Sequence, residues 1–246
     1  MYEQAKYLPV GDQGLLVEFG QSISPGINKM VRGFALALDK SDIPGITEYI
    51  PTYRSVLIFY DPLVWEIGSL IARLGDIENS LSKIKLPEPS IFYLPVAYGD
   101  EYGPDLNNVC HHTGFTKDEV VNIHTSVNYL IYMLGFTPGF PYLGGMDERI
   151  STPRHETPRI KLLAGSVGIA GSQTGIYPVE SPGGWQIIGR TPVKLFDPLK
   201  EKPVLLNPGD YICFFEVSSE KYRQIAKEVE SDRYVVKVSA LTEGEG

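Results

Sequence analysis

The chain has 246 residues, of which 43% are apolar and 21% are charged, and its formal net charge at pH 7 is −8. This composition is typical of a soluble globular protein, and the length is enough for one large domain or two small ones. The negative charge argues against nucleic acid as the main partner, because binding to phosphates needs a basic face.

Cysteine usage and the N-terminus point to a cellular compartment. Cys110 and Cys213 lie far apart without a CxxC spacing, so we expect buried free thiols and no zinc site. The opening MYEQAKYLPVGDQG lacks the basic and apolar regions of a secretion signal. The apolar run 129–136 is too short to span a bilayer. The sequence therefore predicts a cytoplasmic protein with no membrane association.

The first third of the chain alternates between strand-like and helix-like patterns. Ser24 and Pro25 suit the N-cap and first position of a helix. The predicted elements are a strand at 15–19, a helix at 24–41, strands at 46–50 and 55–60, and a helix opening at Asp61-Pro62. This order is ferredoxin-like if one more strand follows, and the candidate is 91–98.

The proline-rich stretch LPEP at 86–89 marks the expected domain boundary. The sequence thus predicts an α+β protein with an N-terminal α/β domain, 1–88, and a second domain, 89–246. Thr116 with Glu119 forms a capping-box pattern. Further predicted elements are a strand at 91–98, helices at 104–112 and 116–124, strands at 126–134 and 211–217, and a helix at 219–230.

Glycine and proline dominate the middle of the second domain. Residues 135–190 hold 11 of the 25 glycines, and short apolar pieces alternate there with turn signals. This texture predicts a closed or partly closed β-barrel with functional loops. Common nucleotide, nucleophile and metal motifs are missing: there is no GxxxxGK[ST], GxSxG or HExxH. The run GSVGIAG at 165–171 lacks the spacing and the helix of a dinucleotide-binding loop.

The same region carries four of the nine arginines, including a Thr-Pro-Arg doublet in TPRHETPR at 152–159. Proline fixes φ before each arginine, so two rigid turns can present guanidinium groups to carboxylate or phosphoryl oxygens. Nearby amides, aromatic rings and glycine pairs can orient a ligand or admit its close approach to backbone. These candidates are Arg154, Arg159, Arg190, Gln173, Tyr177, Gly183, Gly184, Trp185 and Gln186.

A purely structural interpretation stays open for each of these residues. The arginines can be solvated or paired with acidic neighbours, Trp185 can belong to the core, and glycine pairs can be simple turns. His124 is expected to be a hydrogen-bonded residue rather than a base. The residues by themselves therefore indicate an anion-binding loop region without specifying a reaction.

A family resemblance is carried by three long runs, GFTPGFPYLGGMDERISTPR, AGSVGIAGSQTGIYP and SPGGWQIIGRTPVKLFDP. They resemble the KipI/PxpB family, also called allophanate hydrolase subunit 1. GDQGLLVEFG and PTYRSVLIFYDP extend the resemblance to nearly the whole chain. The resemblance implies a C-terminal cyclophilin-like β-barrel domain. It also implies a hetero-oligomeric, ATP-dependent 5-oxoprolinase with KipA/PxpC-like and PxpA-like subunits, a hydrolase that opens a cyclic amide to L-glutamate.

For that reaction the resemblance implies a carboxylate clamp and positive charge around a transferring phosphoryl group, with Arg154, Arg159 and Arg190 as the catalytic candidates. Gln173, Tyr177, Gly183, Gly184, Trp185 and Gln186 are the substrate-binding candidates. Because this chain lacks a phosphate loop, ATP is expected on a partner subunit or across the interface, and the chain alone is expected to be inactive. Two alternatives remain: an inhibitor of a sensor histidine kinase, and a small carboxyltransferase-type subunit acting on urea or a related amide.

Overall fold

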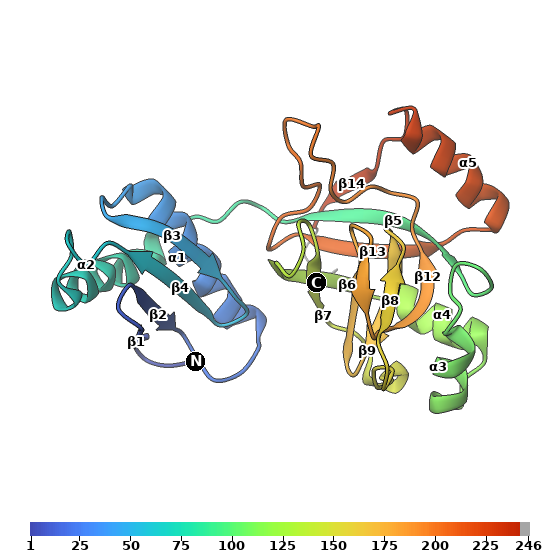
Figure 1. The fold of residues 1–246 in the computed structure, drawn as a ribbon, viewed down its shortest axis with the longest axis horizontal. Coiled ribbons are helices and arrows are strands. Elements are labelled where there is room, and N and C mark those ends of the chain that lie inside the picture. Colours follow the sequence, from blue (N-terminus) through green and yellow to red (C-terminus); the bar gives the residue numbers. More distant parts are fainter. Residues whose placement is uncertain (242–246) are drawn as a thin grey trace. The chain divides into compact units, whose positions relative to one another are not determined.

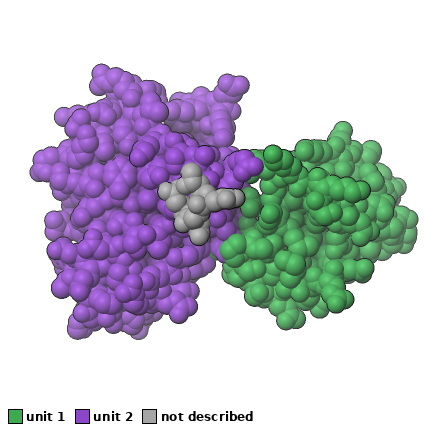
Figure 2. Space-filling view, turned by 180° about the vertical axis from the view of Figure 1, so that it is seen from behind, with its two compact units in different colours: residues 1–87 green, residues 88–246 purple. Residues whose placement is uncertain are grey.

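The computed structural model describes residues 1–241, which belong to two compact units, Met1–Pro87 and Glu88–Gly246. Figure 2 colours the two units separately. Each unit has its own cluster of buried apolar side chains, so each is described by itself. No helix within residues 1–241 has the length and apolar character needed to cross a membrane.

Unit 1 is a four-stranded antiparallel sheet with two helices (Figure 1). The strand order is β1-β2-β4-β3. Buried side chains from the sheet and from both helices, among them Val17, Phe34 and Leu70, form its core. Its elements are β1 (Lys6–Val10), β2 (Gly14–Glu18), α1 (Pro25–Ser41), β3 (Ile46–Pro51), β4 (Ser55–Tyr60), α2 (Ile67–Ser80) and a 3₁₀ turn (Leu81–Lys83).

The edge strand of unit 1 corrects one expectation. β1 pairs with β2 along its whole length, from Lys6 opposite Glu18 to Val10 opposite Gly14. The N-terminal strand therefore supplies the fourth strand of this sheet, for which 91–98 was the candidate, and 91–98 belongs to β5 (Ser90–Tyr98) in unit 2. Most of β5 is buried, which requires a core on both faces, whereas the edge strand β1 is largely exposed.

The two helices of unit 1 begin differently from each other. α1 begins at Pro25, and Ser24 Oγ accepts a hydrogen bond of 3.3 Å from the Ile27 amide, which confirms the predicted cap. α2 begins at Ile67 rather than at Asp61-Pro62, so the predicted start is wrong. Asp61 Oδ1 instead accepts from the Leu63 amide at 2.9 Å, a local turn that competes with the helix.

Unit 2 is built on an eight-stranded sheet that curls into a nearly closed barrel. The order is β10-β9-β12-β5-β13-β6-β7, with β14 beside β5, and the two ends of this order, β10 and β7, contact each other. β5 and β13 run parallel, and the other pairs are antiparallel. The strands are β6 (Asn128–Leu134), β7 (Pro141–Gly144), β8 (Arg159–Leu162), β9 (Ser166–Ala170), β10 (Gln173–Ile176), β11 (Ser181–Gly183), β12 (Gln186–Arg190), β13 (Tyr211–Glu216) and β14 (Lys237–Ala240).

Three helices and a 3₁₀ turn accompany the barrel, and β8 with β11 forms a separate two-stranded sheet. The helices are α3 (Leu106–Thr113), α4 (Lys117–Thr125) and α5 (Ser219–Glu230), and the 3₁₀ turn is Glu148–Ile150. All three helices confirm the predicted ones, as does the reciprocal capping box between Thr116 and Glu119 at the start of α4. Such caps can be predicted from the sequence because they depend only on neighbouring residues.

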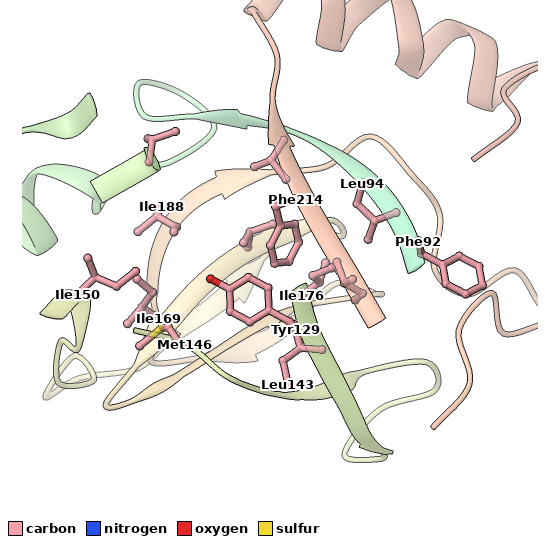
Figure 3. Packing of buried hydrophobic residues seen from close by; sticks show 14 of the residues in the cluster. Phe92, Leu94, Tyr129, Leu143, Met146, Ile150, Ile169, Ile176, Ile188 and Phe214 are labelled. Atoms are coloured by element: carbon pink, nitrogen blue, oxygen red, sulfur yellow. The ribbon is translucent and has the colours of Figure 1, made fainter. Parts of the chain in front are cut away.

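The barrel core combines apolar packing with a series of hydrogen bonds through the buried His124. Figure 3 shows the rings of Tyr129 and Phe214 within this core, with their centroids 5.4 Å apart. His124 is fully buried, and its Nδ1 and Nε2 lie 2.8 Å from the oxygens of Tyr98 and Thr174. Thr174 donates to the Gly168 carbonyl, so it accepts from His124 Nε2–H, and Tyr98 donates to Nδ1. Burial lowers the pKa of His124 to about 3, which keeps the ring neutral.

Both cysteines are free thiols and are partly buried, less completely than expected. Cys110 lies on α3, and burial raises the pKa of its thiol. Cys213 lies on β13, between β5 and β6.

Candidate functional site

A pocket of about 190 Å³ opens in unit 2 among the glycine-rich segments. Its walls come from β7 and the loop before it, from the segment before β8, and from β11 with the residues on both sides of it. These segments are distant in the sequence, and the barrel brings them together. The lining residues are Phe136, Phe140, Tyr142, Arg154, Tyr177, Pro182, Gly183, Gly184 and Trp185.

Three buried rings build the floor of this pocket. Phe140 lies edge-on to Tyr177 and Trp185 at centroid distances of 5.5 and 5.8 Å, and Tyr177 and Trp185 are 6.1 Å apart. Edge-to-face contacts at these distances favour one relative orientation of the rings. Trp185 is therefore both a core residue and a wall of the pocket, so the two interpretations of this residue hold together.

Arg154 supplies the positive charge of the pocket. Its guanidinium carbon lies 5.9 Å from the centre of the Trp185 ring, within the range of a cation–π contact. The residue is exposed, and no carboxylate within residues 1–241 forms an ion pair with it. The charge is thus available to an anion that enters the pocket.

Tyr177 places a neutral hydroxyl beside that charge. Burial raises the pKa of Tyr177 to about 12, while the Arg154 charge acts in the opposite direction. The phenol therefore stays protonated at neutral pH and can donate a hydrogen bond. Within the described residues no protein group hydrogen-bonds to this hydroxyl, which leaves it for a ligand.

The other two candidate arginines do not line the pocket. Arg159 donates from Nη2 to Asp105 Oδ1 at 2.5 Å. The Arg190 guanidinium carbon lies 5.5 Å from the centre of the Tyr102 ring and 5.8 Å from that of Tyr222. Among the three, the structure brings only Arg154 to the aromatic floor, because buried Asp105 and the two tyrosine rings take up the others.

The two glutamines also lie outside the pocket lining. Gln186 is 7% exposed and donates from Nε2 to the Pro153 carbonyl at 2.9 Å, so it holds the backbone next to Arg154. Gln173 begins β10, opposite Ala170 on β9. Arg149, the fourth arginine of this region, is paired with an acidic neighbour, as the structural interpretation expected: its Nη2 lies 2.7 Å from Asp147 Oδ2.

Four lining residues were missed from the sequence: Phe136, Phe140, Tyr142 and Pro182. Three of them belong to the run GFTPGFPY, where aromatic residues alternate with turn formers. Gly139 has φ +79° and Phe136 has φ 65°, so a tight left-handed backbone turns these rings toward the pocket. In the sequence, the aromatic residues between these turn formers were the signal that could have identified this part of the pocket lining. No cluster of His, Cys, Asp or Glu able to hold a metal occurs in the described part of the chain.

Comparison with known proteins places this chain in a family. The family model for the carboxyltransferase domain, subdomain C and D, matches residues 5–206. The chain is 40% identical over 231 residues to a protein of Bacillus subtilis that is named as a subunit of 5-oxoprolinase, covering 89% of this chain and 95% of that protein. It is 30% identical over 267 aligned residues to urea amidolyase from Lachancea kluyveri, covering 94% of this chain and 14% of that protein.

A solved structure shows the same fold at greater sequence distance. The urea amidolyase of K. lactis superimposes with a TM-score of 0.78 at 24% identity, over 96% of this chain and 16% of that chain. The match to the family model spans most of the chain, and the Bacillus subtilis relative corresponds to it nearly end to end. The chain therefore belongs to the carboxyltransferase subdomain C and D family, together with proteins named as subunits of 5-oxoprolinase.

Proposed function

We propose that this chain is the PxpB-type subunit of an ATP-dependent 5-oxoprolinase, a hydrolase that opens the lactam 5-oxoproline to L-glutamate while ATP becomes ADP and phosphate. The observation that carries the proposal is the pocket with a cationic mouth, Arg154, over a floor of Phe140, Tyr177 and Trp185. The 40% identity to the 5-oxoprolinase subunit of Bacillus subtilis over nearly the full length supports it.

The pocket chemistry suits a small ring that carries one carboxylate. Arg154 is the proposed carboxylate partner, because a guanidinium binds a carboxylate through two parallel hydrogen bonds. The apolar lactam ring packs on Trp185 and Phe140, and the protonated Tyr177 hydroxyl donates to the ring carbonyl. Holding the ring in this way supports attack on an otherwise resonance-stabilised amide, because orientation removes part of the entropic barrier.

ATP does not fit this pocket as a co-substrate bound by this chain alone. The pocket is about 190 Å³, below the range of about 300 to 1,000 Å³ typical of larger ligands. Among the described residues that line it, Arg154 is the one cation. A triphosphate needs several donors and cations. We therefore assign ATP to a KipA/PxpC-like or PxpA-like partner subunit, or to a shared interface, and expect this cytoplasmic chain to be inactive alone. The nearly closed barrel is the proposed cyclophilin-like domain.

The proposal is tested by mixing the chain with its PxpA-like and PxpC-like subunits and measuring glutamate release from 5-oxoproline. We expect release that needs ATP and stops when this chain is omitted. Arg154→Ala should lower kcat/KM about 10- to 100-fold, the loss expected for a charge-assisted hydrogen bond of about 1.5–3 kcal/mol. Arg149→Ala is the matched control, because Arg149 is exposed, paired with Asp147 and outside the pocket lining.

A second substrate isolates the carboxylate. On 2-pyrrolidinone, the same lactam ring without a carboxylate, the wild type and Arg154→Ala should turn over equally slowly. Equal activity of the two proteins on 5-oxoproline would remove Arg154 from substrate recognition. An assembled complex that releases no glutamate would favour the carboxyltransferase-type alternative on urea or a related amide, which the 30% identity to urea amidolyase supports.

A further inference from the structure

We propose that Asp105 is a positioning residue that holds Arg154 over the pocket by binding Arg159 and lying against His155 in the segment that carries Arg154. That segment, residues 153–159, is called the arginine segment below. Asp105 lies outside the pocket lining and was not among the residues selected from the sequence. The inference rests on the proposed role of Arg154 at the substrate.

The first step concerns where the Asp105 carboxylate points. Asp105 is the N-cap residue of α3, a position where an aspartate normally accepts a hydrogen bond from the first turn of the helix. Its side chain makes no such bond. Oδ2 accepts from the Ile187 amide at 2.7 Å, and the Asp105 amide donates to the Ile187 carbonyl at 2.9 Å. Asp105 is thus fixed to β12 at two points.

The second step concerns the other carboxylate oxygen. Oδ1 accepts a hydrogen bond from Arg159 Nη2 at 2.5 Å. It also lies 3.3 Å from His155 Nε2, which has no hydrogen-bond partner among the described residues. The Asp105 side chain is only 3% exposed, and a buried carboxylate requires such partners. His155 and Arg159 lie on either side of the centre of the arginine segment. One buried carboxylate therefore ties the segment to β12 through Arg159 and lies against His155.

The third step concerns the backbone on both sides of Arg154. The Pro153 carbonyl accepts from Gln186 Nε2 at 2.9 Å, and the His155 amide donates to the Gly184 carbonyl at 2.7 Å. Arg154 itself is exposed and has no ion pair within residues 1–241. Its place over Trp185 therefore depends on these anchors and on Asp105.

The fourth step is the consequence of losing the negative charge of Asp105. In Asp105→Asn, the amide oxygen can still accept from the Ile187 amide, so the link between α3 and β12 persists. The amide nitrogen then faces Arg159 Nη2, and two donors meet where a carboxylate oxygen accepted a hydrogen bond. Arg159 Nη1 is already buried without a hydrogen-bond partner among the described residues, so no alternative acceptor is at hand. The arginine segment should move away from β12 and carry Arg154 with it.

A fluorescence experiment tests the positioning without any enzyme assay. In a Trp65→Phe background Trp185 is the single tryptophan, because the chain has only two. Iodide is attracted to a nearby guanidinium, whereas acrylamide is neutral, so the ratio of the two quenching constants reports Arg154 at the Trp185 face. We expect Arg154→Ala to lower this ratio at least twofold and Asp105→Asn to lower it comparably. Glu18→Gln, which removes a carboxylate from the 2.7 Å ion pair with Arg54 in unit 1, should leave it unchanged.

Kinetics of the assembled enzyme supply the second readout. Asp105→Asn should raise KM for 5-oxoproline at least tenfold with a smaller change in kcat. The double variant Asp105→Asn/Arg154→Ala should be no worse than Arg154→Ala alone, because both changes remove the same interaction. If Asp105→Asn shows no cooperative thermal transition, Arg159→Gln replaces it, since glutamine keeps a donor for the carboxylate.

Three outcomes would overturn the inference. The first is a quenching ratio for Asp105→Asn equal to that of the parent. The second is a ratio that Arg154→Ala does not change, since Arg154 would then not lie over Trp185. The third is strictly additive losses in the double variant. Full activity of Arg154→Ala would instead contradict the proposed function, while the quenching ratio would still decide whether Asp105 positions Arg154.

Discussion

The hydroxyl of Tyr177 occupies the space that a side chain at Gly183 would need. A Cβ built on Gly183 would overlap the Tyr177 hydroxyl oxygen and would lie 2.7 Å from Leu162 Cδ1. The Tyr177 ring cannot easily turn away, because Phe140 and Trp185 pack edge-on against it. The absence of a side chain at residue 183 is thus a condition for the polar end of Tyr177 to reach the pocket.

Gly183→Ala is therefore expected to lower the free energy of unfolding by about 1–3 kcal/mol, the cost of overpacking a well-filled site. Gly184→Ala is the matched control, because a Cβ there would meet its nearest atoms, the His155 carbonyl oxygen and Pro158 Cγ, at an ordinary contact distance of 3.6 Å. Urea unfolding of both variants gives the comparison. Equal stability losses at the two positions would show that Tyr177 is free to move.

His124 should make the protein less stable in acid. Its folded-state pKa is about 3, against an ordinary value of 6.5, so below pH 6.5 the unfolded chain binds a proton that the folded chain excludes. Stability from this residue is therefore complete above pH 6.5 and is lost as the pH falls toward 3. Between pH 7 and pH 5 the loss is about 2 kcal/mol. The free energy of unfolding in urea at both pH values measures it.

Other groups also titrate in this range, so His124→Gln serves as the reference. Glutamine carries no titrating proton, and the decrease in unfolding free energy from pH 7 to pH 5 should be smaller by about 2 kcal/mol in this variant. The same pH dependence in both proteins would show that His124 is protonated in the folded state.

Tyr98→Phe should destabilise the protein by removing one of the hydrogen bonds that join Tyr98, His124 and Thr174 in the barrel. The change leaves His124 Nδ1 buried without its donor, which costs about 1–3 kcal/mol of unfolding free energy. Tyr93→Phe is the control on the same strand, because the Tyr93 hydroxyl makes one partly buried contact of 3.3 Å, with Ser239, among the described residues. Chemical denaturation should show a clear loss for the first variant and little for the second. A larger loss for Tyr93→Phe would contradict the proton arrangement described above.

Thr116→Ala should remove the N-cap of α4. Thr116 Oγ1 accepts from the Glu119 amide at 3.3 Å, and the loss of such a cap costs about 1 kcal/mol. Thr125→Ala, at the other end of the same helix, removes only a hydroxyl that donates back to the Val121 carbonyl, and should cost a few tenths of a kcal/mol. Thermal unfolding midpoints rank the two variants, and the opposite ranking would reject the capping argument.

Local signals made the helices predictable. The caps at Ser24 and Thr116 are formed within three residues of the helix start, so a short window of sequence contains all of the interacting groups. The predicted start of α2 was wrong for a related reason. Asp61 can serve either a helix or a turn, and the structure uses it in a turn that ends before the Glu66 cap.

Strand partners were harder to predict, because pairing joins residues that are distant in the sequence. β5 reads as a buried strand, yet its residues do not say that it pairs with β13 more than a hundred positions later. β1 has an exposed pattern without clear alternation and was not predicted at all. Its position follows from the hairpin with β2, which only the folded sheet reveals.

The sequence by itself determined the helix caps, the glycine- and proline-rich texture of the barrel, and the region that holds the pocket, because these depend on residue type and close neighbours. It also carried the family resemblance. Only the tertiary structure decided which arginine faces the pocket. Arg154, Arg159 and Arg190 look alike in sequence, but Asp105 binds the second and Tyr102 lies against the third. A guanidinium takes the partner that folding places beside it, and those partners come from elements distant in the chain.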